Sequence, residues 1–290
     1  MQALLDFWAT YRSTVSFAIV NAFFALSTYA VLSAGILSFA TVTYAAFGGF
    51  IGAWTMLHAG FGLLAAIPLA LVCGALLAWL VALIFLRLES HWMALASLAL
   101  ILITRVLVVN APKFTGGVNG LALPRSISLA MLALALVVAM VVFHRLAVSW
   151  FGIASRAVRE DPAVAATLGI PQRRIQTLSF IVSGAVGGAG GMLFALVLQF
   201  LSPDTYFIHM AFTMIAAVVL GGSYHWAGAI LGAAVFTALP IATQAIVPKF
   251  QEVANGIVLL LIMIFLPRGL VDPRAWRLRR AARAPAGEAS

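Results

Sequence analysis

The chain has 290 residues, of which 64% are hydrophobic and only 9% are charged, and its mean hydropathy is +1.11. Soluble domains carry about 25% charged residues, so this composition excludes a water-soluble globular protein and indicates that the bilayer is the solvent. The net charge of +9 does not indicate a nucleic-acid partner, because the basic residues lie between apolar runs and near the C-terminus rather than in a stripe with exposed aromatics.

Nine apolar runs approach the length of about 20 residues that a helix needs to cross a bilayer. In chain order they cover residues 16–35, 39–57, 63–86, 92–109, 127–143, 177–200, 207–222, 226–246 and 254–267. The runs at 39–57 and 207–222 are short or broken by glycine, so either could be a re-entrant or broken helix rather than a full span. The predicted fold is an all-α, polytopic transmembrane helical bundle with about 8–9 spans.

This bundle is expected to form one transmembrane domain over residues 1–272, followed by a basic tail at 273–290. Most of the basic residues lie in two stretches, 144–176 and the chain from residue 268 onwards. With Arg87, these stretches hold 12 of the 17 Lys and Arg residues. Because Lys and Arg are enriched on the cytoplasmic side, both stretches are predicted to be cytoplasmic. Nine spans would then place the N-terminus outside, and the tail would be a topology anchor at anionic lipid.

Glycine pairs four residues apart predict places where two helix backbones approach closely. The pairs are Gly48 with Gly52, Gly184 with Gly188, Gly187 with Gly191, and Gly228 with Gly232.

The sequence lacks the residues that proton coupling, ATP hydrolysis and metal binding would need. All eight acidic residues fall in loops, tails or the ends of apolar runs, which weakens a proton-coupled carrier but leaves sodium sites of carbonyls and hydroxyls open. The only lysines, Lys113 and Lys249, do not follow a phosphate-binding loop, so an ATPase would be a separate protein. The histidines and the single Cys73 show no metal-ligand spacing, and neither a metal site nor a catalytic site is predicted.

The longest polar interruption between runs, Ser155 to Phe180, predicts a short helix outside the bilayer. Asp161 can cap its start, Pro162 suits the first helical position, and Gly169 can end it. Ala165 and Ala166 would give the helix a face of small residues that fits a groove of another protein. These features favour a docking helix over a solvated connector.

This segment resembles the Glu-Ala-Ala…Gly coupling segment of ABC importer permeases, in the form found in the LivH/LivM permease family of branched-chain amino-acid importers. Glu160, Asp161, Ala165, Ala166 and Gly169 occupy the matching positions. Four further stretches are similar to the M-type member: FTGGVNGL from Phe114, LSPDTYF from Leu201, VVLGGSYHWAGAILGAA from Val218, and FLPRGL from Phe265. The family usually has another glycine soon after the pair Gly221-Gly222, where this chain has Ser223 to Trp226.

The resemblance implies a permease subunit that translocates branched-chain or related small amino acids by alternating access. Implied partners are a second permease subunit forming a heterodimer, two cytoplasmic ATPase subunits, a periplasmic substrate-binding protein and membrane lipid. The chain would hold no cofactor, because ATP is bound by the ATPases. The five matched residues, Glu160, Asp161, Ala165, Ala166 and Gly169, would receive force from those ATPases.

A substrate pathway is predicted less specifically. The matched external segment suggests Thr115, Gly116, Gly117 and Asn119, although a glycine turn between two spans explains it equally well. An amino acid's charged ends need hydroxyls or dipoles, which Ser38 could supply together with Thr41, Thr43 and Asn21. The alternative functions are an ion-coupled secondary transporter of small solutes, a channel or a membrane enzyme.

Overall fold

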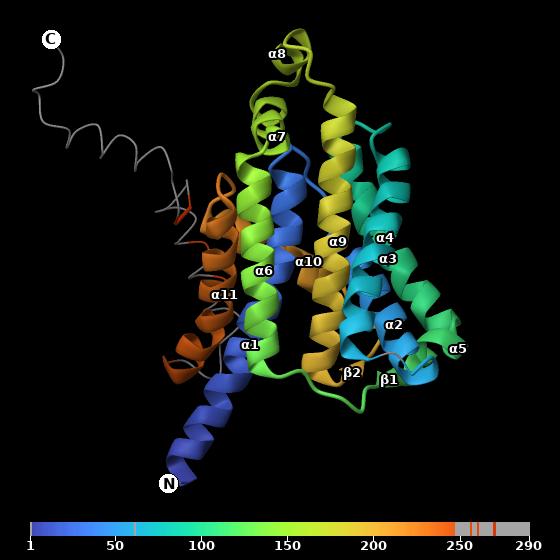
Figure 1. The fold of residues 1–290 in the computed structure, drawn as a ribbon, viewed down its shortest axis with the longest axis vertical. Helices are drawn as coiled ribbons and strands as arrows, with labels where there is room; N and C mark the ends of the chain where they lie inside the picture. Colours follow the sequence, from blue (N-terminus) through green and yellow to red (C-terminus); the bar gives the residue numbers. More distant parts are fainter. Residues whose placement is uncertain (1, 61, 247–255, 257–259, 261–268, 271–290) are drawn as a thin grey trace, which may run out of the picture.

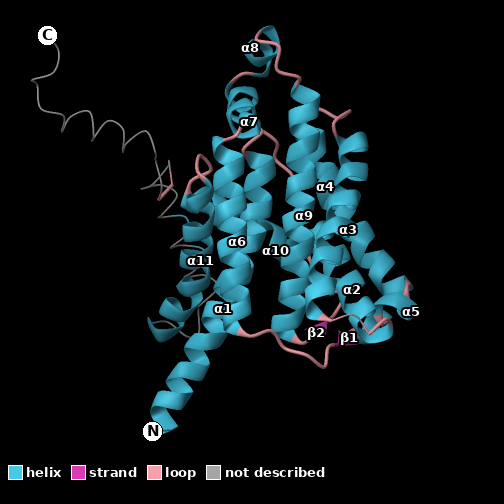
Figure 2. Ribbon diagram, in the orientation of Figure 1, coloured by secondary structure: helices cyan, strands magenta, loops and turns pink. Residues whose placement is uncertain are grey.

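Figure 1 shows the computed structural model, which describes residues 2–60, 62–246, 256, 260 and 269–270. Within this part the chain is a bundle of helices with almost no other regular structure (Figure 2). The long helices are α1 (Gln2–Leu32), α2 (Thr41–His58), α3 (Leu63–Phe85), α4 (Ser90–Asn110), α6 (Leu129–Val148), α9 (Gln172–Leu198), α10 (Ile208–Gly221) and α11 (Trp226–Ile246). The short elements are α5 (Pro112–Thr115), the 3-10 helix η1 (Gly117–Asn119), β1 (Leu121–Ala122), α7 (Trp150–Glu160), α8 (Pro162–Thr167) and β2 (Phe200–Leu201).

Helix α9 lies at the centre of the bundle and packs along α1, α2 and α3 (Figure 1). Its middle turns carry glycine and alanine instead of large side chains, and most of these small residues are buried. Because lipid tails are as apolar as leucine, membrane helices associate mainly through close packing, which small residues allow. The sequence of α9 therefore makes it the helix that three others can approach.

The predicted close approaches at glycine are confirmed at the centre of this packing. A methyl group at Gly188 would overlap the carbonyl oxygen of Ala70 in α3, and one at Gly184 would overlap that of Gly74. From the other side, a methyl group at Gly48 of α2 would overlap the backbone of Gly188. The backbones of α2, α3 and α9 thus touch directly, without room for a side chain between them.

A second glycine contact joins α10 to α11. Methyl groups at Gly228 and Gly232 would overlap the main chain of Gly221 and Ala217, so this predicted pair also marks a close approach. The two helices bend by 119° at the short break between them, which we call the elbow (residues 222–225). The sequence predicts either a broken or a re-entrant helix at 207–222. In the structure this segment forms α10, the first arm of the bent pair.

Five helices of the described part are long and apolar enough to cross a membrane, or six if the bent pair counts as one span. The five lie within α1, α3, α4, α6 and α9. Helix α2 fills the expected run at 39–57, but it has 18 residues, includes polar and glycine positions and is largely buried. The expected run at 254–267 and the tail at 273–290 lie outside the described residues, apart from two isolated positions. The structure is thus a polytopic helical protein, with fewer separate spans described than the 8–9 expected.

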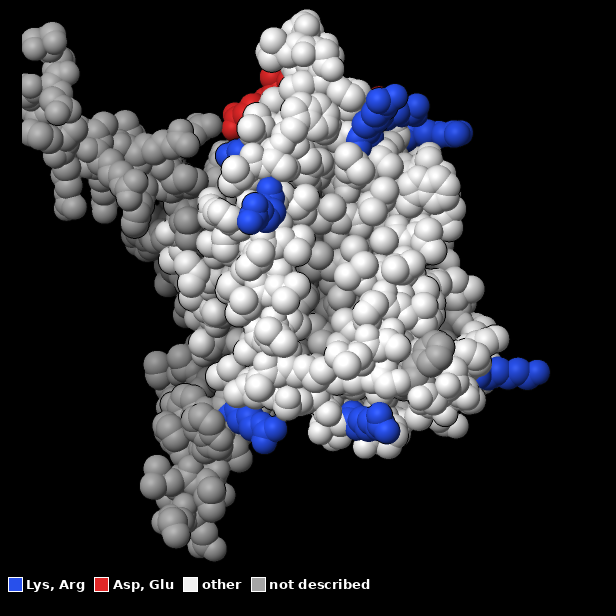
Figure 3. Space-filling view, in the orientation of Figure 1, with Lys and Arg blue, Asp and Glu red and all other residues white. Residues whose placement is uncertain are grey.

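The distribution of charge matches a protein that sits across a bilayer. On the face seen in Figure 3, the Lys, Arg, Asp and Glu side chains lie towards the two ends, and the band between them is free of charge. Helices α3, α4 and α6 turn large apolar side chains outward along their length, including Leu76, Leu102 and Leu134. Such a surface is unfavourable in water and suits contact with lipid.

Two loops at one end of the bundle are joined by a short antiparallel strand pair. Leu121 of β1 pairs with Leu201 of β2, and Leu123 N–H donates to the carbonyl of Gln199 at 2.8 Å. Helices α7 and α8 lie at the other end, and α1 begins at the end opposite α8 (Figure 1). The expected all-α class thus holds for the described part except for these two-residue strands.

Candidate functional site

The predicted coupling segment forms two short helices, α7 and α8, at one end of the bundle (Figure 1). Helix α7 packs on α6 and α9, and α8 follows after the single residue Asp161. Trp150 and Ile153 on α7 are exposed, whereas Ala154 and Val158 are buried against the bundle. The segment is therefore fixed to the bundle on one side and open on the other.

Both ends of α8 are capped as the sequence predicts. The Asp161 carboxylate accepts hydrogen bonds from the N–H groups of Ala163 and Val164 at 2.8 and 3.1 Å, and Pro162 is the first helical residue. At the other end, Gly169 N–H donates to Ala166 O and Ile170 N–H to Ala165 O, both at 3.0 Å. This is a Schellman cap, which needs a left-handed residue, and Gly169 has a φ of +77°.

The two alanines of α8 do not share an exposed face. Ala165 is 1% exposed and packs with Ala34, Val158 and Ile175, whereas Ala166 is exposed. The apolar side chains that point away from the bundle are Val164 and Leu168, which are 54% and 72% exposed. Neither residue was among the predicted docking residues, although two apolar residues four apart beside a capped helix outside the membrane are a usable signal.

Arg159, near the end of α7, holds the elbow between α10 and α11. Its Nη1 donates to the carbonyl of Ser223 at 2.5 Å, and its Nη2 donates to the Ser223 hydroxyl at 2.8 Å. Its guanidinium also lies over the Tyr224 ring, 4.6 Å from the centroid. In the sequence, Arg159 is notable only as one of the basic residues of the cytoplasmic stretch, and Ser223 and Tyr224 only as a departure from the family pattern. The contact joins residues 64 positions apart, so no local pattern revealed it.

His225 completes the elbow by capping α11. Its Nδ1 accepts a hydrogen bond from the N–H of Ala227 at 3.1 Å, which requires the ring to carry its hydrogen on Nε2. Burial lowers the pKa of His225, and the positive charge of Arg156 and the neighbouring His144 lower it further. The neutral ring is thus favoured in the folded chain, consistent with its acceptor role.

The predicted external pathway segment forms a turn at the opposite end. The Thr115 hydroxyl donates to the carbonyl of Ala111 at 2.8 Å and accepts from Gly117 N–H at 3.2 Å. Gly116 and Gly117 both have positive φ, and a methyl group at Gly120 would overlap the carbonyl of Leu201. These contacts support the turn interpretation, and the exposed Asn119 shares the 3-10 helix with Gly117.

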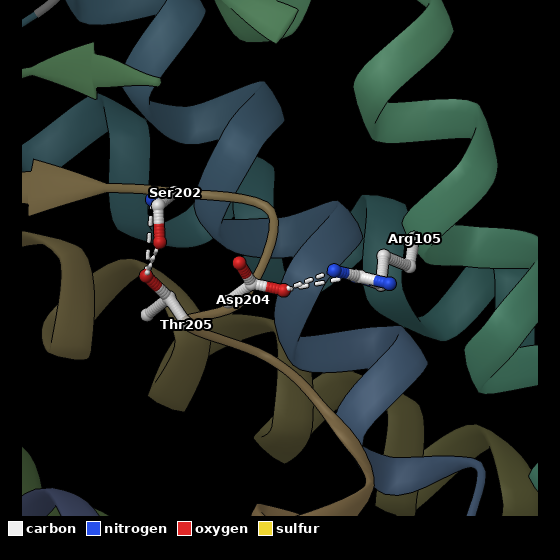
Figure 4. A network of polar contacts seen from close by, with 4 residues as sticks. All are labelled: Arg105, Ser202, Asp204 and Thr205. Carbon is white, nitrogen blue, oxygen red and sulfur yellow. Dashed lines mark hydrogen bonds and ion pairs between the residues drawn. The ribbon is translucent and has the colours of Figure 1, made fainter. Parts of the chain in front are cut away.

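The neighbouring Ser-Pro-Asp loop is tied to α4 at this end (Figure 4). Both Nε and Nη2 of Arg105 approach one carboxylate oxygen of Asp204, at 2.9 and 2.8 Å. Within the loop, Ser202 N–H donates to the Thr205 hydroxyl at 3.0 Å. Since the side chains of Arg105 and Asp204 are 45% and 67% exposed, the pair contributes only about 0.2–1 kcal/mol. Its contribution is chiefly to hold the loop in place.

Ser38 lies apart from the external segment. It precedes the first turn of α2, where its hydroxyl accepts from Ala40 N–H at 3.3 Å, whereas Thr115 shares an apolar groove with Trp54 and Thr55 near the other end of α2. The other proposed hydroxyls bond within the bundle: Thr43 to Thr104 at 3.3 Å and Thr41 to Thr28 at 3.4 Å. The structure does not bring the predicted pathway residues into one site.

Comparison with known proteins identifies relatives over most of the chain. A family model described as branched-chain amino acid transport system / permease component matches residues 11–267. The high-affinity branched-chain amino acid transport system permease protein LivM of Escherichia coli (strain K12) is 29% identical over 286 aligned positions, covering 83% of this chain and 66% of the relative. LivM of Salmonella typhimurium (strain LT2) is 30% identical, covering 78% of this chain and 62% of the relative.

These matches span slightly less than two thirds of the relatives' own length. A shorter match is to the guanosine ABC transporter permease protein NupQ of Bacillus subtilis (strain 168), which is 32% identical over 108 positions and covers 36% of this chain. No solved structure matches the chain.

Proposed function

The chain belongs to the branched-chain amino acid transport permease family, and on that premise we propose that it is the membrane subunit of an ATP-driven importer. Its cargo would be branched-chain or related small amino acids, moved by alternating access. The subunit itself hydrolyses nothing and needs no cofactor, because ATP is bound by two partner ATPases. A second permease subunit, a periplasmic binding protein and surrounding lipid complete the proposed assembly, in a bacterial-type inner membrane with the C-terminus cytoplasmic.

The observation that carries this proposal is α8, a capped helix held beyond the end of the bundle with two apolar side chains outward. The Asp161 and Gly169 caps fix the helix, and Ala165 attaches it to the bundle. Val164 and Leu168 are then available to enter a groove of an ATPase, as an apolar helix ridge does in many complexes. Glu160, Asp161, Ala165, Ala166 and Gly169 would thus shape and mount the helix, while Val164 and Leu168 contact the partner.

A route from α8 into the membrane part follows from the Arg159 contact. A push on α8 acts on α7, because one residue separates the two helices. Arg159 then passes the displacement to Ser223 and Tyr224, and so to the elbow of the bent pair. Bent and broken helices are the elements that rearrange in many transporters. We propose that this contact couples ATP hydrolysis to movement of α10 and α11.

Uptake by reconstituted vesicles tests the proposed function. The full chain, assembled with its second permease and ATPases, should accumulate leucine, isoleucine or valine only when ATP is supplied on the ATPase side and the binding protein on the other. Because no acidic residue is expected at mid-membrane, uptake should survive ionophores that dissipate proton and sodium gradients. Uptake driven by an ion gradient without ATP would replace this proposal with an ion-coupled carrier. Guanosine belongs in the cargo panel because of the NupQ match.

Replacing Arg159 by Met should reduce the cargo moved per ATP hydrolysed about tenfold or more. The change removes two hydrogen bonds from a charged donor and its contact with the Tyr224 ring, and a charged hydrogen bond contributes about 1.5–3 kcal/mol. The measurement is leucine uptake and phosphate release in the same vesicles. Arg174→Met, an exposed arginine at the start of α9, is the matched control. An unchanged ratio in Arg159→Met would remove Arg159 from the coupling route.

A further inference from the structure

A small cavity lies where α1, α6, α7, α9 and the elbow meet, and the proposed transport function does not use it. Its volume is about 50 Å³, which is room for about three to five water-sized groups. One wall is apolar and includes Phe143, Leu146 and Val182. The polar lining residues are Ser155 and Arg156 from α7, Tyr224 and His225 from the elbow, and Tyr29 and Ser33 from α1 and the turn after it. A ligand for this cavity needs both a polar and an apolar part.

The polar wall holds a hydroxyl without a partner. Ser155 is 2% exposed, and its Oγ makes no hydrogen bond to any described residue. A buried, unpaired hydroxyl is costly, so such a group usually marks a missing partner. A second buried donor without a partner in the described part, Trp226 Nε1, follows directly after His225 in the chain.

Two further side chains at the cavity, those of His225 and Arg156, present hydrogen-bond donors. His225 accepts from Ala227 N–H through Nδ1, so its Nε2 carries the hydrogen. Arg156 is held at the cavity by donating to the carbonyls of Gly152 and Ala147, at 3.1 and 3.0 Å, and it brings a permanent positive charge. Among the described lining residues none is a carboxylate. The wall therefore offers hydrogens and positive charge, which an oxyanion requires.

We propose that this cavity binds an oxyanion joined to an apolar group. The oxyanion would accept hydrogen bonds from Ser155 and His225 beside Arg156, and the apolar group would pack on Phe143, Leu146 and Val182. Two sources carry this chemistry: a free aliphatic carboxylate from the cytoplasm, or the phosphate of an anionic lipid. The lipid source has access, because exposed Val148 and Trp150 place the start of α7 at the level of the headgroups.

An occupant would contact both elements that Arg159 joins, α7 and the elbow. It would therefore add a second contact between α7 and the elbow and stabilise their present arrangement over one in which the elbow has moved. On the proposed function, occupancy would inhibit transport, and the concentration of a cytoplasmic acid or the lipid composition of the membrane would determine the occupancy.

Equilibrium binding to the full chain in phosphatidylcholine nanodiscs tests the site. Radiolabelled propionate, which has a carboxylate and no amine and is small enough for the cavity, should bind, whereas propylamine, which has an amine and no carboxylate, should not. Ser155→Ala should weaken binding of propionate about tenfold or more. Its thermal stability should not fall, because the hydroxyl that it removes has no partner. Ser128→Ala, at the far end of α6, should leave binding unchanged.

The source is distinguished by repeating the measurement in nanodiscs that contain phosphatidylglycerol. If lipid is the occupant, phosphatidylglycerol abolishes propionate binding, and native mass spectrometry shows less phosphatidylglycerol retained by Ser155→Ala than by the wild-type chain. If a free carboxylate is the occupant, binding is the same in both lipids. Equal binding of the acid and the amine, or no effect of Ser155→Ala on either probe, would overturn the proposal. Since no ATP or cargo delivery is involved, this result is independent of the uptake test.

Discussion

Leu168→Glu should abolish ATP-driven uptake while the membrane bundle stays folded. Leu168 is 72% exposed on α8 and contributes little to the bundle, but it is the largest apolar side chain that this helix turns outward. Burying a carboxylate in an apolar groove costs several kcal/mol, and interface anchors commonly contribute about 2 kcal/mol or more. A loss of 2 kcal/mol weakens ATPase binding about 30-fold. The measurement is ATPase retained on the immobilised chain, followed by uptake in vesicles.

Leu168→Met is the control for this experiment, because it keeps an apolar side chain of similar reach and should retain uptake. Thermal unfolding of both variants in detergent should match the wild-type chain, since neither change touches a buried side chain. Normal ATPase binding by Leu168→Glu would show that α8 docks through another face or does not dock.

Gly188→Ala should unfold the bundle or prevent its insertion. In an isolated helix this change is favourable by about 1 kcal/mol, because alanine has the higher helix propensity. In this chain the added methyl group would overlap the carbonyl of Ala70, and Gly48 of α2 packs on the same backbone from another side. Overpacking costs about 1–3 kcal/mol where side chains can adjust, and here the obstacle is main chain. The expected loss is therefore about 3 kcal/mol or more, measured by thermal unfolding and by yield from membranes.

Gly62→Ala provides the matched control, since nothing lies within 4 Å of a methyl group at that position and its backbone is extended. It should change the unfolding temperature by only a few degrees. If the Gly188→Ala chain is as stable as the Gly62→Ala chain, the backbones of α3 and α9 are farther apart than in the structure.

Local chemistry made much of α8 predictable. The Asp161 cap, Pro162 at the first position and the left-handed Gly169 act within a few residues, so the sequence contains the complete motif. Which face of the helix points away from the bundle could not be predicted in the same way. Whether Ala165 or Leu168 faces outward depends on contacts with Ala34, in the turn after α1, and with Ile175 of α9. For this reason the prediction that Ala165 and Ala166 share an exposed face was wrong.

The number of spans shows the same limit. Hydropathy located eight segments that are helical in the described part, because apolar length is a property of consecutive residues. Length and glycine content set the runs at 39–57 and 207–222 apart from full spans, and the second is one arm of a bent pair. The sequence did not show that α2 is a continuous helix covered by α3 and α9, or that α10 and α11 meet at 119°.

Composition, apolar runs and ordered motifs determined from the sequence alone that this is a helical membrane protein of the branched-chain amino acid permease family, and the family match confirms it. Only the tertiary structure showed that Arg159 binds Ser223 and that the two loops at the end opposite α8 pair through β1 and β2. It also showed that the Ser155 hydroxyl borders a cavity and has no hydrogen-bond partner in the described part. These features join residues far apart in the chain. The distances between these residues are set by how the helices pack against one another. A pattern within a few consecutive residues does not show that packing.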